Sequence, residues 1–532
     1  MDLDYFVSEA NKSITNKEIP QAIEFLQEAY KINPKSIDIC SKLGILHLQI
    51  GELESSIQYF KQSILLDPKS SIPYSNLGII YFKLKNKSLS LKNYLKALEL
   101  NPNNFLINYN LGNYYLFYDD LENAEKCYLQ SIVLQPNNFW PYNNLFQIYD
   151  RSNNLKKLDQ IIYKILNNFK RSAPIKFLEG MYEFRKKNYE KTIQIFSDLD
   201  IDSKDIQRRS IKENILGKCY DHVEMYSEAF KHFSISNDIL YKSNLNKSDK
   251  NNSRDLVHKR LNYFSNHFLK FDSFHAEYDK YIDPVFLIGF PRSGTTLLDT
   301  ILRTHKLIKV IEEKPLVPEL INEINKFTKQ DFAQLNTLEK NSIEKLRESY
   351  FKRMRDLVGF DRNLIYIDKL PLNIIYVAEL KKIFPKAKFI LCLRNPYDVI
   401  LSCFMQPFIP NDAMSNFYNL NDASDYYDKV MTLWKKYDEL LNLDKHVIKY
   451  EDVVNNFDMT IKSMLKFLSV DWSDDLKNFY NTAEKRGFIN TPSYDQINMP
   501  LYKKSISRWK NYSDKLSHLN STLDKWVKTF KY

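Results

Sequence analysis

Apolar, small and polar positions recur every 34 residues over residues 1 to about 240 of this 532-residue chain. An aromatic residue, a glycine, a second small residue and a proline that follows a polar residue all return at that interval. These columns predict stacked pairs of antiparallel helices, because small residues let helices approach closely, the aromatic ring fills the gap and proline ends the second helix. The columns are Phe60, Tyr94 and Tyr128; Gly44, Gly78 and Gly112; Ala29, Ser63, Ala97 and Ser131; and Pro34, Pro68, Pro102 and Pro136.

The repeat resembles the tetratricopeptide repeat, and weaker copies follow at Phe177 to Phe196 and at Leu216 to Phe230. One unit cannot bury its apolar face alone, so roughly five or six units are expected to stack into a superhelix with a concave groove. Such a groove usually binds a peptide or a partner helix. Alternatively, the array only supports or dimerises the rest of the chain, and the sequence leaves both interpretations open.

The pattern changes after the repeats. Residues 241–252 are polar and predict a hinge, and a helical spacing of apolar residues then leads to a second domain that begins near residue 280. In that domain, four short apolar runs predict strands. The runs begin at Val285, Leu364, Lys388 and Val447.

The stretch from Gly289 to Gly294 predicts a phosphate cradle between a buried strand and a helix that begins near Thr295. Loop amides and the positive end of the helix dipole both favour an anion there. The glycines match the nucleotide-binding pattern G-x-x-x-x-G-K-[ST], but Thr295 stands in place of its lysine. A nucleotide kinase would need that lysine and carboxylates for magnesium, so we expect a nucleotide whose transferable group differs.

The stretch Pro291 to Thr296 resembles the 5′-phosphosulfate loop of sulfotransferases that use 3′-phosphoadenosine 5′-phosphosulfate (PAPS). The resemblance covers roughly residues 280–515 and is to tyrosylprotein sulfotransferases and to bacterial sulfotransferases fused to tetratricopeptide repeats. It implies a tetratricopeptide superhelix (1–240), a polar hinge and connecting helix (241–279), and an α/β, P-loop-like PAPS-dependent domain with a parallel sheet (280–532). The loop residues implied to bind PAPS are Pro291, Arg292, Ser293, Gly294, Thr295 and Thr296.

The resemblance also implies catalytic roles. Glu313, the second of two adjacent glutamates, would be the general base that takes the proton of an acceptor hydroxyl. His305 is an alternative base, since the cytosolic branch of the superfamily uses histidine, although a structural role at the end of the preceding helix is the simpler interpretation. Lys369 and Ser493 would stabilise the oxygen that leaves sulfur.

A second nucleotide-binding segment follows the third predicted strand. Arg394 at the strand end and Ser402 in the next helix match the 3′-phosphate site of the relatives, and a guanidinium fork suits a phosphate. Tyr450 matches a tyrosine that contacts the nucleotide. Arg508 matches a basic residue that closes over a phosphate near the C-terminus.

Three positions depart from the tyrosylprotein relatives. Pro315 and Glu319 stand where these relatives carry arginines that pair with acidic residues around the target tyrosine. Gln406 replaces a second basic residue of the 3′-phosphate site, so the 3′-phosphate is expected to be held less tightly. Because a carboxylate in place of an arginine repels acidic peptides, we expect that highly acidic tyrosine peptides are not the natural acceptor.

Composition refines this interpretation. The net charge of +10 suits an anionic nucleotide and is too diffuse to indicate nucleic acid. The N-terminus shows no secretory signal and no run of 18 apolar residues occurs, so we expect a cytoplasmic protein without a membrane span. The five scattered cysteines predict neither a metal site nor a disulfide framework.

The predicted reaction moves a sulfuryl group from PAPS to a hydroxyl acceptor, with 3′,5′-ADP as the second product and no metal. The acceptor is a protein tyrosine, a saccharide hydroxyl or a small alcohol, and the repeats would recruit the acceptor or a protein partner. Two alternatives stay open. One is a nucleotide kinase, and the other is an interaction scaffold with an inactive nucleotide-binding domain.

Overall fold

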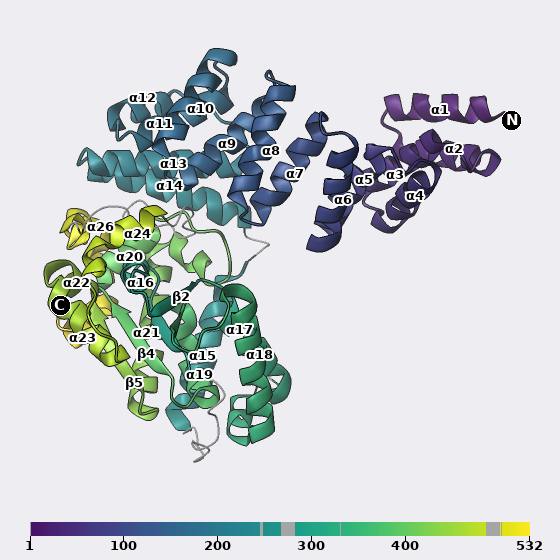
Figure 1. The fold of residues 1–532 in the computed structure, drawn as a ribbon. Coiled ribbons are helices and arrows are strands. Elements are labelled where there is room, and N and C mark those ends of the chain that lie inside the picture. Colours follow the sequence, from purple (N-terminus) through teal and green to yellow (C-terminus); the bar gives the residue numbers. More distant parts are fainter. Residues whose placement is uncertain (1, 245–247, 268–281, 330, 486–500, 502) are drawn as a thin grey trace. The chain divides into compact units, whose positions relative to one another are not determined.

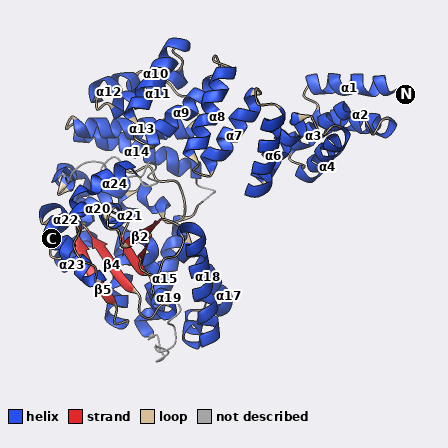
Figure 2. Cartoon of the chain, in the orientation of Figure 1, coloured by secondary structure: helices blue, strands red, loops and turns tan. Residues whose placement is uncertain are grey.

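The computed structural model describes residues 2–244, 248–267, 282–329, 331–485, 501 and 503–532. The chain divides into two compact units, Met1–Leu178 and Glu179–Tyr532 (Figure 1). Helices occur in both units, whereas the strands lie in the second (Figure 2).

The first unit is a series of paired helices, as the 34-residue pattern predicts. In the first four pairs, the second helix ends two residues before a proline of the repeat, as α2 does at Ile32 before Pro34. The helices are α1 (Leu3–Thr15), α2 (Ile19–Ile32), α3 (Ile37–Ile50), α4 (Leu53–Leu66), α5 (Ser71–Lys83), α6 (Lys87–Leu100), α7 (Phe105–Phe117), α8 (Leu121–Leu134), α9 (Phe139–Arg151), α10 (Leu155–Asn168) and α11 (Ala173–Arg185), the last of which continues into the second unit.

The repeat glycines lie against the repeat aromatics. A Cβ atom added at Gly112 would lie 2.7 Å from Cε1 of Tyr128, and one added at Gly44 would lie 2.8 Å from Cε1 of Phe60. The Ser56 hydroxyl also donates to the Gly44 carbonyl at 2.6 Å, so the two helices of a pair are in direct contact. The predicted helical array with close helix approach is confirmed.

The weaker repeats begin on α11, continue in the second unit and use the same packing. A Cβ at Gly180 would lie 2.1 Å from Cε1 of Phe196, and one at Gly217 would lie 2.8 Å from Cδ1 of Phe233. The sequence interpretation placed this weaker copy at Leu216 to Phe230, whereas the aromatic ring against Gly217 is Phe233, at the separation found in the other units. Phe230 instead stacks on Phe404, with ring centroids 5.1 Å apart. The helices concerned are α11, α12 (Tyr189–Ser197), α13 (Ile206–His222) and α14 (Tyr226–Asn244).

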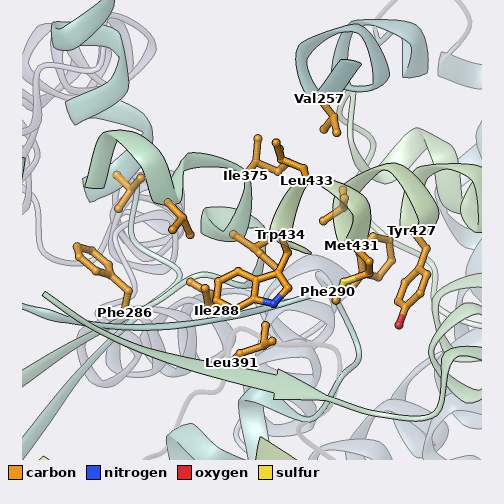
Figure 3. Close-up of a cluster of buried hydrophobic side chains, with 14 of the residues drawn as sticks. Val257, Phe286, Ile288, Phe290, Ile375, Leu391, Tyr427, Met431, Leu433 and Trp434 are labelled. Carbon is orange, nitrogen blue, oxygen red and sulfur yellow. The ribbon is translucent and has the colours of Figure 1, made fainter. Parts of the chain in front are cut away.

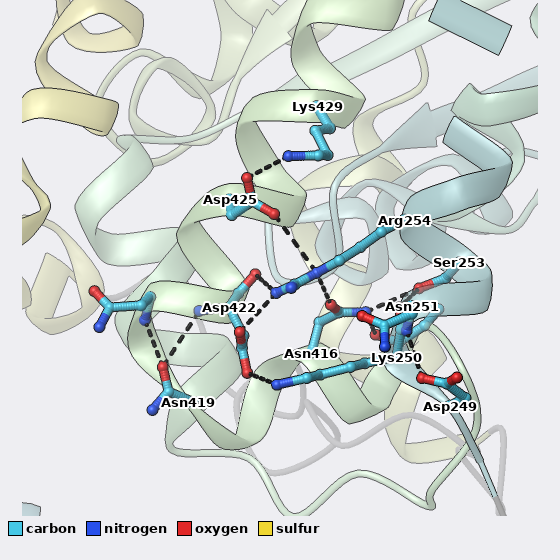
Figure 4. Close-up of polar contacts among 12 residues, drawn as sticks. Asp249, Lys250, Asn251, Ser253, Arg254, Asn416, Asn419, Asp422, Asp425 and Lys429 are labelled. Carbon is cyan, nitrogen blue, oxygen red and sulfur yellow. Dashed lines mark hydrogen bonds and ion pairs between the residues drawn. The ribbon is translucent and has the colours of Figure 1, made fainter. Parts of the chain in front are cut away.

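The array was predicted to end near residue 240, whereas the compact units meet at residues 178 and 179. Beyond α14, the helix α15 (Lys250–Asn266) binds the sheet domain through polar contacts (Figure 4). Lys250 and Arg254 both bind the Asp422 carboxylate, at 2.5 and 2.8 Å. The domain limits drawn from the sequence stay predictions.

The sheet of the second unit has five parallel strands in the order β2-β3-β1-β4-β5. The predicted parallel sheet is confirmed, but the sequence did not predict β2 as a strand. The strands are β1 (Val285–Gly289), β2 (Ile308–Glu312), β3 (Ile365–Lys369), β4 (Lys388–Leu393) and β5 (Asp444–Lys449).

Helices and short 3₁₀ helices surround this sheet. The helices are α16 (Thr295–Arg303), α17 (Leu316–Thr328), α18 (Lys340–Val358), α19 (Val377–Ile383), α20 (Pro396–Phe404), α21 (Leu420–Leu440), α22 (Tyr450–Asn455), α23 (Phe457–Leu468), α24 (Phe479–Lys485), α26 (Ser513–Leu516) and α27 (Asn520–Thr529). The 3₁₀ helices are η1 (Phe332–Thr337), η2 (Pro371–Tyr376), η3 (Met414–Tyr418), η4 (Asp474–Asn478), η5 (Lys503–Ser505), η6 (Arg508–Tyr512) and η7 (Ser517–Leu519).

Alternate residues of β1 enter two hydrophobic cores, as expected for a strand buried on both faces. Phe286 and Ile288 pack in a cluster with Trp434 of α21 (Figure 3). Val285 and Leu287 pack in a second cluster, which includes residues of α16 and α23. The central strand is therefore held rigidly, and the loop that follows it starts from a fixed point.

The strand order brings the predicted site segments to one edge of the sheet. Because β1 pairs with β4, Gly289 lies beside Cys392, two residues before Arg394. On the other side, β2 pairs with β3 and places Glu312 beside Lys369. In α/β sheets, ligands bind at the carboxyl ends of strands where the strand order reverses, which here is the end of β1. Among the described residues, no helix is both long and apolar enough to cross a membrane.

Candidate active site

The turn between β1 and α16 is a tight cradle that requires its glycines. A Cβ at Gly289 would lie 2.6 Å from the Cys392 carbonyl oxygen and 2.8 Å from Ser293 Oγ. Gly294 has φ +103°, and a Cβ there would lie 2.8 Å from Cδ2 of Tyr450. Arg292 also adopts a positive φ of 69°. The predicted loop therefore forms, with Thr295 and Thr296 buried in the first turn of α16.

The two predicted phosphate-binding segments contact each other directly. Arg292 Nε donates to Ser402 Oγ at 3.0 Å, and Arg394 Nη1 donates to the Arg292 carbonyl oxygen at 3.2 Å. The Arg394 guanidinium lies 4.9 Å from the ring centroid of Tyr450. Four of the residues predicted to bind the nucleotide thus lie at one place, although they come from three segments of the chain.

Two buried polar atoms of this cluster have no hydrogen-bond partner among the described residues. They are Ser293 Oγ in the loop and Arg394 Nε at the end of β4. A buried donor without a partner is unfavourable, so such atoms indicate a place for a ligand. Arginine, hydroxyl and loop amides are the donors that a phosphate accepts, and this set fits a phosphorylated nucleotide.

A small pocket joins the C-terminal segment to this cluster. Asp398 holds that segment, because its carboxylate accepts hydrogen bonds from the amides of Ser507 at 2.8 Å and Trp509 at 2.9 Å. Burial raises the pKa of Asp398, and the nearby Arg394 opposes this effect. Arg508, which lies between these two amides, lines the pocket together with Arg394 and Ser402. The pocket is lined by Arg394, Asp398, Leu401, Ser402, Met405, Ser505 and Arg508.

Lys369 lies fully buried among three carboxylates. Its Nζ is 2.7 Å from Glu313 Oε1, 3.2 Å from Glu312 Oε1 and 3.8 Å from Asp299 Oδ2. The Glu313 side chain is 33% exposed, so it has access to solvent. The Glu313 amide also donates to the Lys369 carbonyl oxygen at 2.8 Å, which fixes the turn after β2. The predicted base and the predicted leaving-group lysine are thus brought together.

Asp299 is a member of this cluster that the sequence interpretation missed. It is fully buried in α16, where Arg303 Nη2 binds its Oδ1 at 2.7 Å. An aspartate four residues before an arginine in a helix is the available signal, but that spacing is typical of any surface ion pair.

Asp368, the residue before Lys369, is also buried. Burial raises the pKa of Asp368 to about 7, although a hydrogen bond from the Tyr350 hydroxyl at 2.9 Å opposes this rise.

Three further residues were singled out in the sequence, namely His305, Ser493 and Arg508. His305 is buried, and its Nδ1 accepts a hydrogen bond from the Leu307 amide at 3.2 Å, as expected of a residue that closes α16. Ser493 lies outside the described residues. Arg508 binds Asp221 of α13 at 2.6 Å, a partner that the sequence did not indicate.

Comparisons with known proteins find matches in two parts of the chain. Residues 284–474 match the model of the sulfotransferase family. Three models of the tetratricopeptide repeat match residues 37–70, 72–104 and 93–126. The chain thus contains a sulfotransferase-family domain preceded by tetratricopeptide repeats, as the sequence indicated.

Curated relatives match less than half of the chain. Protein-tyrosine sulfotransferase 1 of Danio rerio is 25% identical over 246 residues, which is 44% of this chain and 67% of that protein. An uncharacterized protein of Aquifex aeolicus is 26% identical over 260 residues, or 46% of this chain and 33% of that protein. Among solved structures, the sulfotransferase domain of the Synechococcus PCC 7002 olefin synthase is 20% identical, with a TM-score of 0.36, and covers 48% of this chain and 97% of that chain.

Proposed function

We propose that this chain, whose C-terminal region carries a sulfotransferase-family domain, transfers a sulfuryl group from PAPS to a hydroxyl acceptor. The observation that carries the proposal is the meeting of Arg292 with Ser402 and Arg394 at the end of β1. Two phosphate-binding segments in direct contact suit one small molecule with phosphates at two ends. The unpartnered Ser293 Oγ and Arg394 Nε support the same interpretation.

In the proposed reaction, loop amides with Arg292, Ser293, Thr295 and Thr296 hold the 5′-phosphosulfate. The acceptor oxygen forms a bond to sulfur while the bond from sulfur to the bridging oxygen breaks. Glu313 takes the acceptor's proton, and the electron pair of the broken bond stays on the 5′-phosphate. The products are a sulfate ester and 3′,5′-ADP.

Lys369 would stabilise the charge that develops on the leaving oxygen, because a buried cation acts there in a medium of low dielectric constant. Ser493 is proposed to assist it. Lys369 is bound to Glu313 at 2.7 Å, so this ion pair has to loosen as the lysine turns to the donor. Arg394 and Ser402 would bind the 3′-phosphate and thereby select PAPS against ATP, with Tyr450 and Arg508 completing the nucleotide site.

The acceptor is proposed to be a macromolecule, either a protein tyrosine or a saccharide. The tetratricopeptide repeats would recruit it or a protein partner, because grooves of such arrays bind peptides and helices. The relatives named protein-tyrosine sulfotransferases support a tyrosine acceptor. The cytoplasmic location stays a prediction.

Ligand binding tests the donor. We expect 3′,5′-ADP to raise the melting temperature of the protein, because a ligand that binds only the folded state stabilises it. ATP with magnesium should leave the melting temperature unchanged. Stabilisation by ATP with magnesium and not by 3′,5′-ADP would favour a nucleotide kinase instead. Transfer of label from radiolabelled PAPS to fractions of a cell lysate would then identify the acceptor.

Acidic tyrosine peptides should be poor acceptors. Glu319 and Glu323 of α17 share one cation, Arg353 of α18, at 3.2 and 2.6 Å. Two carboxylates therefore face a single guanidinium here, and negative charge exceeds positive charge. Initial rates can be compared for tyrosine peptides flanked by aspartate and by asparagine, and we expect the asparagine peptide to react faster. Glu319→Arg should reduce the difference in initial rate between the two peptides. Equal or faster sulfation of the aspartate peptide by the wild type would contradict this expectation.

A further inference from the structure

A residue of the last repeat holds Arg508, which lines one pocket with Arg394 and Ser402, the residues proposed to bind the donor's 3′-phosphate. Asp221 lies at the end of α13 and binds the guanidinium through both oxygens. Arg508 Nη2 is 2.6 Å from Oδ2, and Arg508 Nε is 3.3 Å from Oδ1. Asp221 lies outside both the segment that matches the sulfotransferase family and the segments that match tetratricopeptide repeats.

The Asp221 carboxylate is itself fixed in place. The Tyr512 hydroxyl donates to its Oδ1 at 2.5 Å, and the buried Tyr512 ring packs edge-on against Tyr226 of α14. The Asp221 side chain is 13% exposed. A carboxylate held by a second donor gives Arg508 a defined direction, which an arginine on a free surface does not have.

The helix that carries Asp221 is also bound to the other wall of the pocket. Asn214 of α13 donates to the Met405 carbonyl oxygen at 2.9 Å, and Asn237 of α14 donates to the Phe404 carbonyl oxygen at 2.9 Å. Both carbonyls lie at the end of α20, the helix that carries Ser402. Two repeat helices therefore set the distance between α20 and the segment that contains Arg508.

We propose that Asp221 is a positioning residue that orients Arg508 toward the 3′-phosphate of the donor. Arg508 lines the pocket with Arg394 and Ser402. Fixing an arginine side chain on binding costs conformational entropy, and a carboxylate that fixes it beforehand removes part of that cost. The last repeat is then a part of the donor site rather than an appended module. This inference rests on the proposed function, since it needs a donor with a 3′-phosphate.

Calorimetric titration of the full-length chain with 3′,5′-ADP and with 5′-AMP tests the role of Asp221. In Asp221→Asn and Asp221→Ala, we expect the dissociation constant for 3′,5′-ADP to rise about tenfold. The dissociation constant for 5′-AMP should change less than about twofold, because 5′-AMP lacks the phosphate that Arg508 faces. A merely structural role would weaken both ligands alike. Melting temperatures without ligand show whether each variant folds. If Asp221→Ala does not fold, Asp221→Asn alone is used for the titrations.

Glu213→Gln is the matched control. Glu213 lies on the same helix, is equally exposed at 13%, and binds His232 at 2.7 Å rather than Arg508. Both dissociation constants should stay unchanged in this variant. In an Arg508→Ala background, Asp221→Ala should cause no further loss of 3′,5′-ADP affinity, because the residue acts through Arg508.

Several results would overturn the inference. The inference fails if the losses of 3′,5′-ADP affinity add up in the double variant, or if the Asp221 variants lose equal affinity for 3′,5′-ADP and 5′-AMP. It also fails if their affinity for 3′,5′-ADP is unchanged. Tighter binding of 3′,5′-ADP by Asp221→Asn would contradict it as well, because the carboxylate would then only repel the phosphate. Failure of the wild type to bind 3′,5′-ADP would instead refute the proposed function, and the inference would fall with it. The wild-type titration therefore separates the two failures.

Discussion

Glu313→Gln is expected to lower turnover about 10²- to 10⁴-fold, the usual contribution of a general base. The substitution keeps the size of the side chain but removes its capacity to take a proton. Binding of 3′,5′-ADP should stay within about twofold of the wild type, because the proposed nucleotide contacts lie elsewhere. The measurement is single-turnover transfer from PAPS, combined with calorimetric titration of 3′,5′-ADP.

Two other residues serve as comparisons for Glu313. Glu312 also lies near Lys369, at 3.2 Å, but its side chain is only 10% exposed, so Glu312→Gln should have a smaller effect on turnover. His305→Asn should leave turnover close to that of the wild type, because the imidazole is buried and bonded to the Leu307 amide. If Glu312→Gln or His305→Asn lowered turnover more than Glu313→Gln does, the base would have to be reassigned to that residue.

The features that the sequence predicted correctly depend on local patterns. The repeat columns place glycine and aromatic residues on paired helices, and those contacts recur at Gly44 with Phe60 and at Gly112 with Tyr128. The phosphate loop was predictable because Gly289 and Gly294 satisfy constraints of close approach and positive φ within a few residues. The loop signal lies within a few residues, and the repeat signal is one spacing that recurs every 34 residues, so neither depends on the pairing of strands.

The features that it missed depend on pairings between distant segments. Strand β2 was not predicted, and the contact of Lys369 with Glu312 follows from the register of β2 on β3. Asp299 and Asp221 gain their partners through the fold, and an isolated aspartate in a helix gives no sign of either contact. A residue spacing describes one segment, whereas these sites are built from two or three.

Lys369→Met is expected to affect both stability and catalysis. Removal of the buried cation takes away the positive charge that lies among the carboxylates of Asp299, Glu312 and Glu313. Breaking such a buried ion pair typically costs about 3–5 kcal/mol of unfolding free energy. Loss of charge stabilisation on the leaving oxygen should lower turnover about 10²- to 10³-fold. Urea unfolding and single-turnover transfer measure the two effects.

The two effects of Lys369 can be separated. Adding Glu312→Gln to Lys369→Met removes one of the unbalanced carboxylates, so part of the unfolding free energy should return while turnover stays low. Lys388→Met is the matched control, since Lys388 lies at the start of β4 and donates to the Phe467 carbonyl oxygen at 2.6 Å, at the opposite edge of the sheet. Its turnover should match the wild type. If the double variant regained turnover together with stability, Lys369 would hold the fold of the site and have no part in the departure of the leaving group.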